Sequence, residues 1–269
     1  MAMKMRLTIA LLFVMLTACE EKIDLPLQTL HLTDIVVEGI LTNEKINHKI
    51  KLSRPYTKQN EVPTPVSGAV VSISDGSSSI TLAESPIGSG EYYTPVARAV
   101  FGKTYTLAIK FQGKTYTAQD SPMPVEPLSP LDYRKVSELY TLNLNKSGQD
   151  ANFIDHHISW SNTTACTSGS ICEGRVVFYD LKTIDVNEIF KPNKEDFNFP
   201  VNSVVIRRKY SVSPSYKAFL RSMLSETEWR GAVFDVQRAD VTTNLSEGAI
   251  GFFAVSTVVS DTTVVVAKP

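Results

Sequence analysis

Short runs of alternating apolar and polar residues follow one another from about residue 35 to residue 119. They are rich in Val, Ile, Thr and Tyr and are separated by Gly, Pro and Asp-Gly, which is typical of short β-strands. The pattern predicts strands at Ile35–Thr42, His48–Ser53, Ala69–Ser74, Ile80–Glu84, Glu91–Thr94, Thr104–Phe111 and Lys114–Gln119. Because an immunoglobulin-like β-sandwich needs about seven strands, we predict one over residues 35–120.

Two tight hairpins are predicted inside this sandwich. Asp75-Gly76 lies between "AVVSIS" and "SSSITL", and Gln112-Gly113 lies between "KTYTLAIKF" and "KTYTAQ". Glycine supplies the positive φ that such turns require. Alternation in the strand before the second turn places four side chains on one face, which we assign to the core: Tyr105, Leu107, Ile109 and Phe111.

A proline-rich segment, "SPMPVEPLSP" at 121–130, follows the predicted sandwich. Proline fixes φ and disfavours helix before it, so we expect a stiff, extended linker. Residues 131–269 then form a second β-rich domain in our interpretation. Its predicted strands are Phe153–Trp160, Arg175–Leu181, Ser203–Tyr210, Phe234–Thr242 and Gly251–Val259.

One amphipathic helix is predicted within the second domain, near residues 214–230. Ser213 can cap it, Pro214 suits the first helical position, and Gly231 can end it. The apolar residues Tyr216, Phe219, Leu220, Met223 and Leu224 follow the spacing of a buried stripe. We expect this helix to cover a sheet, with binding of a partner as the alternative.

The amino terminus has the pattern of an export signal. Lys4 and Arg6 precede an apolar run that ends at Leu16, and small residues follow. The run of about ten residues is too short to span a bilayer as a helix. Leu-Thr-Ala-Cys at 16–19 resembles a bacterial lipobox, so we expect a signal peptide at 1–18, lipidation of Cys19 and a tether at 19–34. An ordinary signal peptide is the alternative.

Composition narrows the choice of partners. The chain carries 27 basic and 28 acidic side chains, and removal of residues 1–18 would leave 25 basic and 28 acidic ones in 251 residues. This slightly negative balance gives no general attraction to nucleic acid, so no nucleic-acid partner is expected. Recognition has to depend on shape and local chemistry.

Two cysteines remain after Cys19, namely Cys166 and Cys172 in "ACTSGSICEG". In an oxidising compartment such a pair predicts a disulfide that closes a small loop. Free thiols are the next alternative. A zinc site is disfavoured because zinc takes four ligands and no histidine lies within eight residues of either cysteine.

No catalytic motif is found in the sequence. A nucleophile elbow, a phosphate-binding Gly-rich loop and His-Glu-x-x-His are all missing. His156 and His157 would point to opposite faces of a strand, whereas Asp155 and His157 share a face and could form an acid-base pair. Carboxylate pairs such as Glu195 with Asp196 or Glu226 with Glu228 are interpreted as solvated charges. We therefore predict no catalytic residue, no metal and no cofactor.

Aromatic side chains are the remaining candidates for contact with a glycan or a peptide. These are Tyr56, Tyr92, Tyr93, Trp160 and Trp229. Adjacent tyrosines project to opposite faces of a strand, so one of Tyr92 and Tyr93 should be buried and the other exposed. For both tryptophans, packing in the core is favoured over contact with a ligand.

Several phrases, in their order along the chain, resemble one family of Bacteroidota lipoproteins, domain of unknown function 4249. They are "EEKIDL" after Cys19, then "IVVEGILT", "KLSRPYT", "PVSGAVVSISD", "ETEW" and "NLSEGAIGFF". The resemblance implies an outer-membrane lipoprotein whose genes often accompany those of TonB-dependent transporters. In that phylum an acidic tract after the cysteine is associated with display on the cell surface, and Glu20 and Glu21 match the start of such a tract.

Three functional hypotheses follow. The first is a non-catalytic, lipid-anchored accessory of a TonB-dependent β-barrel transporter in the outer membrane, which could bind a glycan or peptide ligand. The second is a structural or adhesive component of the cell envelope. The third is a hydrolase of glycans or peptides, for which we expect a concave pocket with convergent carboxylates or histidines.

Overall fold

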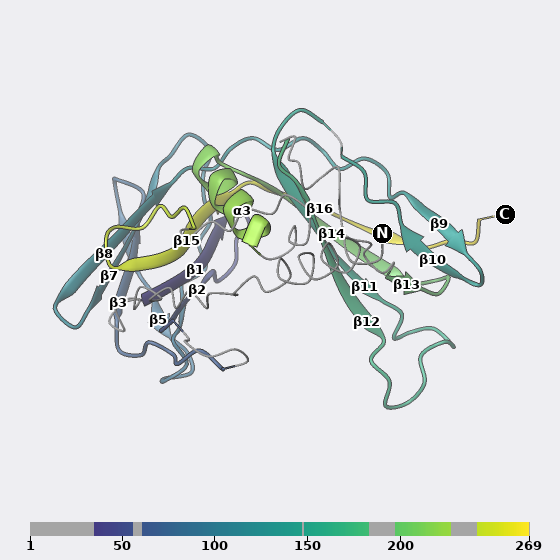
Figure 1. Ribbon diagram of the computed structural model, residues 1–269, viewed down its shortest axis with the longest axis horizontal. Coiled ribbons are helices and arrows are strands. Elements are labelled where there is room, and N and C mark those ends of the chain that lie inside the picture. The colour runs from purple at the N-terminus through teal and green to yellow at the C-terminus, as the bar shows by residue number, and fades with distance from the viewer. Residues whose placement is uncertain (1–34, 56–60, 147, 183–196, 227–240, 269) are drawn as a thin grey trace, which may run out of the picture. The chain divides into compact units, whose positions relative to one another are not determined.

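The computed structural model describes residues 35–55, 61–146, 148–182, 197–226 and 241–268 (Figure 1). All of them belong to one compact unit, Thr33–Pro269. Strands dominate this unit, which confirms the predicted all-β fold with one helix. Among the described residues, no helix is both long enough and apolar enough to cross a membrane.

A sandwich of two sheets forms the N-terminal part of this unit. The first sheet has the strand order β15 (Ala249–Ser256), β1 (Ile35–Thr42), β2 (Lys49–Ser53), β6 (Glu91–Tyr93), β5 (Ala83–Glu84). The second has the order β4 (Ser79–Thr81), β3 (Val70–Ser74), β7 (Tyr105–Phe111), β8 (Lys114–Asp120). Their inner faces share one apolar core, which includes Val37, Leu52, Leu107 and Phe253. The predicted β-sandwich is therefore present.

One predicted strand, Ile80–Glu84, divides into two. β4 pairs with β3 in the second sheet, whereas β5 pairs with β6 in the first. Leu82 lies between them with an exposed fraction of 5% and belongs to the shared core. The chain passes from one sheet to the other at this residue, so a single apolar run supplies an edge strand to each sheet.

The second predicted hairpin is confirmed in detail. Phe111 pairs with Lys114, which leaves Gln112 and Gly113 as a two-residue loop with φ values of 48° and 78°. Two positive φ values in such a loop are the requirement of a type I′ turn. On β7, Tyr105, Leu107 and Ile109 are buried as predicted, and Phe111 is partly buried against the same core.

β15 joins the N-terminal sandwich from far along the chain. It pairs in parallel with β1, from Ile35 opposite Ala249 to Thr42 opposite Ser256. The sequence predicts residues 131–269 in a second domain, but β15 of this region lies in the first sheet, so the linker at 121–130 does not divide the strands as expected. The outer edge of β15 is covered by Asn244, whose side chain exchanges two hydrogen bonds with the backbone of Phe253, at 2.8 and 3.2 Å.

Two further sheets are built from the later part of the chain. One has the order β12 (Glu173–Asp180), β11 (Asn152–Ser159), β14 (Val204–Ser211), β16 (Val258–Val264). The other has the order β13 (Asn198–Phe199), β10 (Leu139–Leu142), β9 (Tyr133–Val136). A second apolar core, with Tyr133, Tyr140, Ile158, Phe199 and Val205, includes residues of both sheets.

Several expectations for this region need correction. β9, β10 and β13 were not predicted, and Gly251–Val259 divides into the end of β15 and the start of β16. The predicted strand Phe234–Thr242 lies outside the described residues except for its last two, which are not in a strand.

The predicted helix is α3 (Pro214–Glu226). Ser213 caps it, because its Oγ accepts a hydrogen bond of 3.2 Å from the N–H of Tyr216. A third core contains the buried side chains of Tyr216, Leu220 and Leu224 together with Phe252 of β15. In Figure 1, α3 lies beside β15. The helix thus covers a sheet as expected, and the residues predicted to follow Glu226 lie outside the described part.

Candidate functional site

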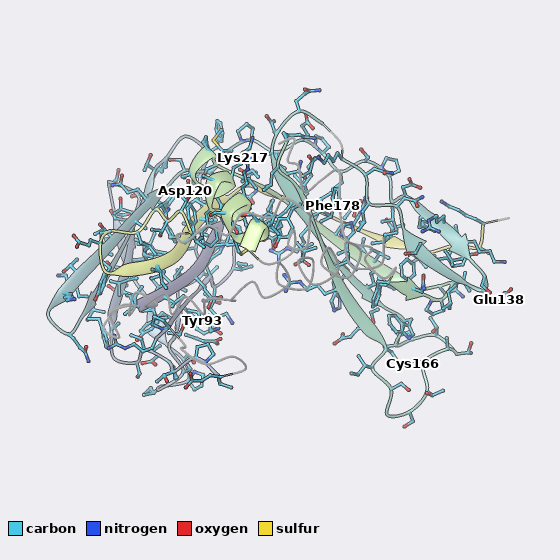
Figure 2. All side chains as sticks on the ribbon, in the orientation of Figure 1. Tyr93, Asp120, Glu138, Cys166, Phe178 and Lys217 are labelled. Carbon is cyan, nitrogen blue, oxygen red and sulfur yellow. A yellow bond between two sulfur atoms is a disulfide. The ribbon has the colours of Figure 1, made fainter. Side chains whose placement is uncertain are left out.

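A pocket of about 220 Å³ lies over one face of the sheet β12-β11-β14-β16. Three parts of the chain line it: the end of the proline-rich stretch with the two residues after it (128–132), the end of β10 with the residues after it (142–145), and side chains of β11, β12 and β14. Phe178, labelled on β12 in Figure 2, is one of them. The proline-rich stretch was predicted to be only a linker, but it forms a wall of this pocket.

Strand register brings five of the lining side chains together. On β14, Arg207 and Lys209 are two residues apart and therefore project to the same face of the sheet. Their partners on β11 are His156, opposite Arg207, and Ile154, opposite Lys209. Ile154 is in turn opposite Phe178 of β12. His156, Arg207 and Lys209 thus form a basic band on the sheet beneath the pocket.

Arg207 is the fixed charge of this band. Its exposed fraction is 5%. Its Nε donates to Oδ1 of Asp261 at 2.8 Å, and its Nη2 donates both to Oδ2 of Asp261 and to the carbonyl of Ser129, the latter at 2.8 Å. Two nitrogen atoms of the guanidinium thus face the two carboxylate oxygens of Asp261, which is the bidentate geometry of a strong arginine–carboxylate pair. Arg207 therefore holds the proline-rich wall against the sheet, and its charge is balanced by Asp261.

Lys209 differs from Arg207 in having no counter-ion. Its exposed fraction is only 3%, and its side chain lines the pocket. Among the described residues, no hydrogen bond or ion pair involves its ammonium group. Buried charges in proteins are nearly always paired, because removing an ion from water is costly. An unpaired buried lysine is therefore an unusual feature of this face.

His156 adds a neutral polar group. Its Nδ1 lies 3.1 Å from the carbonyl oxygen of Val176, which requires a proton on Nδ1 and leaves a lone pair on Nε2. Burial lowers the pKa of His156, and the charge of Arg207 lowers this pKa further. At neutral pH the ring is thus an uncharged group with one free acceptor.

The rest of the lining is mostly apolar. Three partly buried leucines lie around the basic band, namely Leu128, Leu131 and Leu142. At the exposed rim, Oδ1 of Asp132 accepts a hydrogen bond of 3.0 Å from Nδ2 of Asn143. The pocket therefore combines apolar walls with one cation that has no counter-ion, one neutral acceptor and a carboxylate at the rim. Such an arrangement can bind an anionic group attached to an apolar body.

The acid-base pair considered from the sequence does not form. Asp155 accepts two hydrogen bonds from Arg175, at 2.7 and 2.8 Å, and Nε2 of His157 lies 3.4 Å from a carboxylate oxygen of Glu173. As predicted, His156 and His157 occupy opposite faces, one buried and the other exposed. Within the described ranges, no group of three or more His, Cys, Asp or Glu side chains could hold a metal ion.

The structure joins Cys166 and Cys172 in a disulfide, the pairing that the sequence predicts. It closes the loop between β11 and β12, where Figure 2 labels Cys166. Cys19, the predicted site of lipidation, lies outside the described residues, as do Glu195, Asp196 and Glu228.

The aromatic candidates do not form a common surface. Tyr92 is buried, and its hydroxyl donates to the carbonyl of Val66 at 2.9 Å, whereas the hydroxyl of Tyr93 donates to Glu91. Trp160 is partly buried and packs against the second core. Tyr56 and Trp229 lie outside the described residues. The expected buried tyrosine is therefore Tyr92, whereas Tyr93, expected to be exposed, is partly buried.

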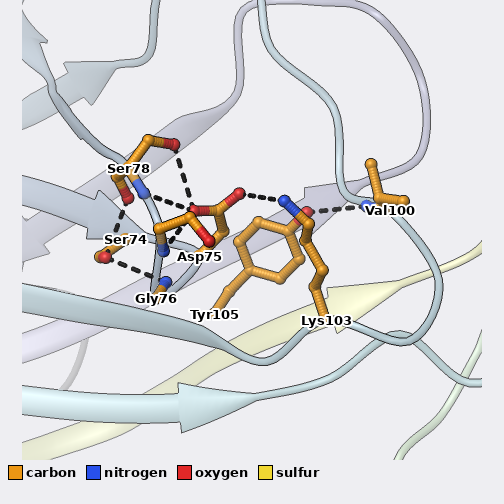
Figure 3. A network of polar contacts seen from close by, with 8 residues as sticks. Ser74, Asp75, Gly76, Ser78, Val100, Lys103 and Tyr105 are labelled. Carbon is orange, nitrogen blue, oxygen red and sulfur yellow. Dashed lines mark hydrogen bonds and ion pairs between the residues drawn. The ribbon is translucent and has the colours of Figure 1, made fainter.

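A second polar network, shown in Figure 3, has a structural role. Oδ1 of Asp75 accepts hydrogen bonds from the N–H groups of Ser77 and Ser78, and Oδ2 accepts one from Nζ of Lys103 at 2.5 Å. The contact with Lys103 is the main reason that the pKa of Asp75 lies far below its usual range. This network fixes the turn between β3 and β4, and the polar groups of Asp75 and Lys103 are already paired with each other.

Sequence reasoning missed Arg207 and Lys209. A signal for them was present: in "VVIRRKYS", alternation puts both residues on the same face as Val205, which is fully buried. A strand with basic residues on its buried face is unusual. The pairing with His156 could not be predicted, because it depends on the register between β11 and β14.

Comparison with known protein families matches residues 20–262 to the family described as Domain of unknown function (DUF4249). No curated protein matches the chain. All residues that line the pocket fall within 128–209 and therefore inside the matched range.

Proposed function

The chain belongs to the family described as Domain of unknown function (DUF4249), and we propose that it is a lipid-anchored protein of the outer membrane. In this proposal it acts as a non-catalytic accessory of TonB-dependent nutrient uptake. It binds a ligand or the transporter itself and carries out no reaction.

The single observation that carries the proposal is the sequence at the amino terminus. A basic start, an apolar run and Leu-Thr-Ala-Cys at 16–19 are together the features of a lipoprotein signal. Several acyl chains on one cysteine would anchor a protein far more firmly than the reversible binding of a single chain. The resemblance to Bacteroidota lipoproteins that accompany TonB-dependent transporters supports the choice of partner.

The pocket over β11 and β14 supports a binding role. The polar groups on the sheet beneath it are the ammonium of Lys209, a guanidinium already paired with Asp261, and one neutral histidine, and its rim carries the amides of Asn143 and Asn145. Glycoside hydrolysis needs two carboxyl groups across the scissile bond, whereas the lining contains one acidic residue, Asp132. Its chemistry suits the holding of a ligand better than the cleavage of one.

The test is an affinity purification of the full-length, lipidated protein from detergent-solubilised outer membrane, with mass spectrometry of the bound proteins. Stoichiometric recovery of a TonB-dependent β-barrel is the expected result. The Cys19→Ala variant is the control, and we expect it to be lost from the membrane fraction. Recovery of no partner by an intact, membrane-bound protein would contradict the proposed association with a transporter.

A structural or adhesive role in the envelope is the second candidate. One observation favours it: the segment between β6 and β7 exposes Val96, Val100 and Phe101 to 56%, 44% and 68%. Exposed apolar side chains that lie close in the chain often contact other macromolecules. Binding of the purified protein to whole cells or envelope polymer, without a transporter in the purification, would favour this role.

A further inference from the structure

The unpaired ammonium of Lys209 is the starting point. The whole residue has an exposed fraction of 3%, and its side chain reaches the pocket, where Nζ keeps a small contact with solvent. A buried charge that lacks a counter-ion destabilises the free protein. A ligand that brings a negative charge to this position would offset that cost. We propose that the pocket binds a small organic monocarboxylate, whose carboxylate pairs with Lys209.

Neighbouring polar groups can complete the site. The Nε and Nη2 atoms of Arg207 are used by Asp261 and Ser129, and Nη1 has no acceptor among the described residues. It can donate to the second carboxylate oxygen. Nε2 of His156 carries a lone pair, since Nδ1 faces the carbonyl of Val176. It can accept a hydrogen bond from a hydroxyl or amide group of the ligand.

The walls of the pocket favour an organic acid over an inorganic anion. Leu128, Leu131, Leu142, Ile154 and Phe178 line it, and apolar walls stabilise an apolar ligand body by excluding water from both. The volume of about 220 Å³ is below the roughly 300–1,000 Å³ of sites for drug-sized ligands. The ligand should therefore be of metabolite size.

The carboxylate of Asp132 at the rim limits the number of negative charges that the ligand can carry. Asp132 lies at the exposed edge of the pocket, where Asn143 and Asn145 donate hydrogen bonds to its carboxylate. The charge of Arg207 is already balanced by Asp261. Lys209 is thus the cation of the lining that has no paired carboxylate, which matches one carboxylate on the ligand, whereas a second negative charge on the ligand would be repelled by Asp132 at the rim.

This inference deepens the binding role proposed above by naming a ligand class, and it can be tested without any transporter. The full chain, purified in detergent, is titrated with phenylacetate by isothermal titration calorimetry. Phenylacetamide, the neutral isostere, and inorganic phosphate are titrated in parallel. We expect binding of phenylacetate at micromolar to low-millimolar concentration, with at least tenfold weaker binding of both other compounds.

The decisive variant is Lys209→Met, which keeps a long side chain and removes the charge. We expect it to weaken phenylacetate binding at least tenfold and to raise the melting temperature of the free protein, because an unpaired buried charge is lost. Lys110→Met is the matched control, since Lys110 is exposed on β7. It should change neither binding nor melting temperature appreciably.

The possible results separate clearly. Equal binding of phenylacetate by the parent protein and the Lys209→Met variant, or no binding by either, would overturn the proposal. Binding of phosphate in preference to phenylacetate would overturn the ligand class. A lower melting temperature of Lys209→Met, relative to Lys110→Met, would show that Lys209 has a structural role instead. A transporter recovered without carboxylate binding would leave the accessory role standing and refute only this site.

Discussion

The backbone N–H of Val255 donates a hydrogen bond of 2.8 Å to Oδ2 of Asp120, which precedes it by 135 residues. Asp120 ends β8, and Val255 lies on β15, the strand that the later part of the chain adds to the first sheet. Asp120 has an exposed fraction of 7%, and the side chain of Ser213, the cap of α3, lies close enough to lower the pKa of its carboxyl group. One side chain thus joins both sheets of the sandwich and the only helix of the described residues.

Replacing Asp120 by Ala should destabilise the protein. The N–H of Val255 would lose its acceptor in a buried place, which costs about 1–3 kcal/mol. Chemical denaturation followed by circular dichroism measures the change in the free energy of unfolding. Asp120→Asn, which keeps an acceptor oxygen, should lose much less, and Asp132→Ala, at an exposed carboxylate, serves as the control. Equal losses for Asp120→Ala and Asp132→Ala would contradict the role of this hydrogen bond.

Asp120 also has a predictable pH dependence. Burial raises the pKa of its carboxyl group in the folded protein, although the hydrogen bond from Val255 and the nearby side chain of Ser213 act in the opposite direction. The folded state therefore binds this proton more tightly than the unfolded state. Its contribution to stability falls as the pH rises from the ordinary value of 3.8 through the raised pKa. The same variant, Asp120→Asn, should lack this part of the pH profile.

The sequence predicts those parts of the fold that depend on residues close together in the chain. Alternation over "TYTLAIKF" and the Gln112-Gly113 turn are local, and β7 and β8 lie where they were expected. β9 and β10 were missed because they have four residues each, with one buried residue in β9 and two in β10. The apolar alternation in them is too short to stand out.

Pairing between strands that are far apart in the chain could not be predicted from the sequence, and the candidate site depends on such pairing. Nothing in "AIGFFAVS" indicates that it pairs with β1 rather than with a nearer strand. In the same way, Lys209 is an ordinary basic residue in the sequence. It becomes buried in a pocket only because β14 lies beside β11 and the segment 128–132 lies over the sheet.

The pairing of β15 with β1 leads to a test at Gly251. Its φ is +96°, and a Cβ atom there would lie 2.1 Å from the carbonyl oxygen of Val37. Gly251→Ala should therefore cost about 2–4 kcal/mol of unfolding free energy, from backbone strain and from the clash. The measurement is denaturant unfolding of the full chain.

Gly113→Ala is the matched control for Gly251→Ala. Gly113 also has a positive φ, of +78°, but a Cβ there would meet nothing within 4 Å. This variant should lose only the strain of the left-handed conformation, about 1–2 kcal/mol. If both alanine variants were equally stable, the close approach of β15 to β1 at Gly251 would be wrong.

Stability of the protein should decrease on mild acidification, with His156 as one cause. Burial lowers the pKa of His156 below the ordinary value of 6.5, and burial also lowers the pKa of His48. Below pH 6.5 the unfolded chain therefore takes up protons that the folded protein does not, so the free energy of unfolding falls as the pH falls.

His156→Asn removes the titration, and its Nδ2 can still donate towards the carbonyl of Val176. This variant should show a shallower decrease between pH 7.5 and 5.5 in denaturant unfolding, whereas His157→Asn, at the exposed neighbour, should follow the parent protein. A slope unchanged in His156→Asn would show that the buried imidazole does not control this transition.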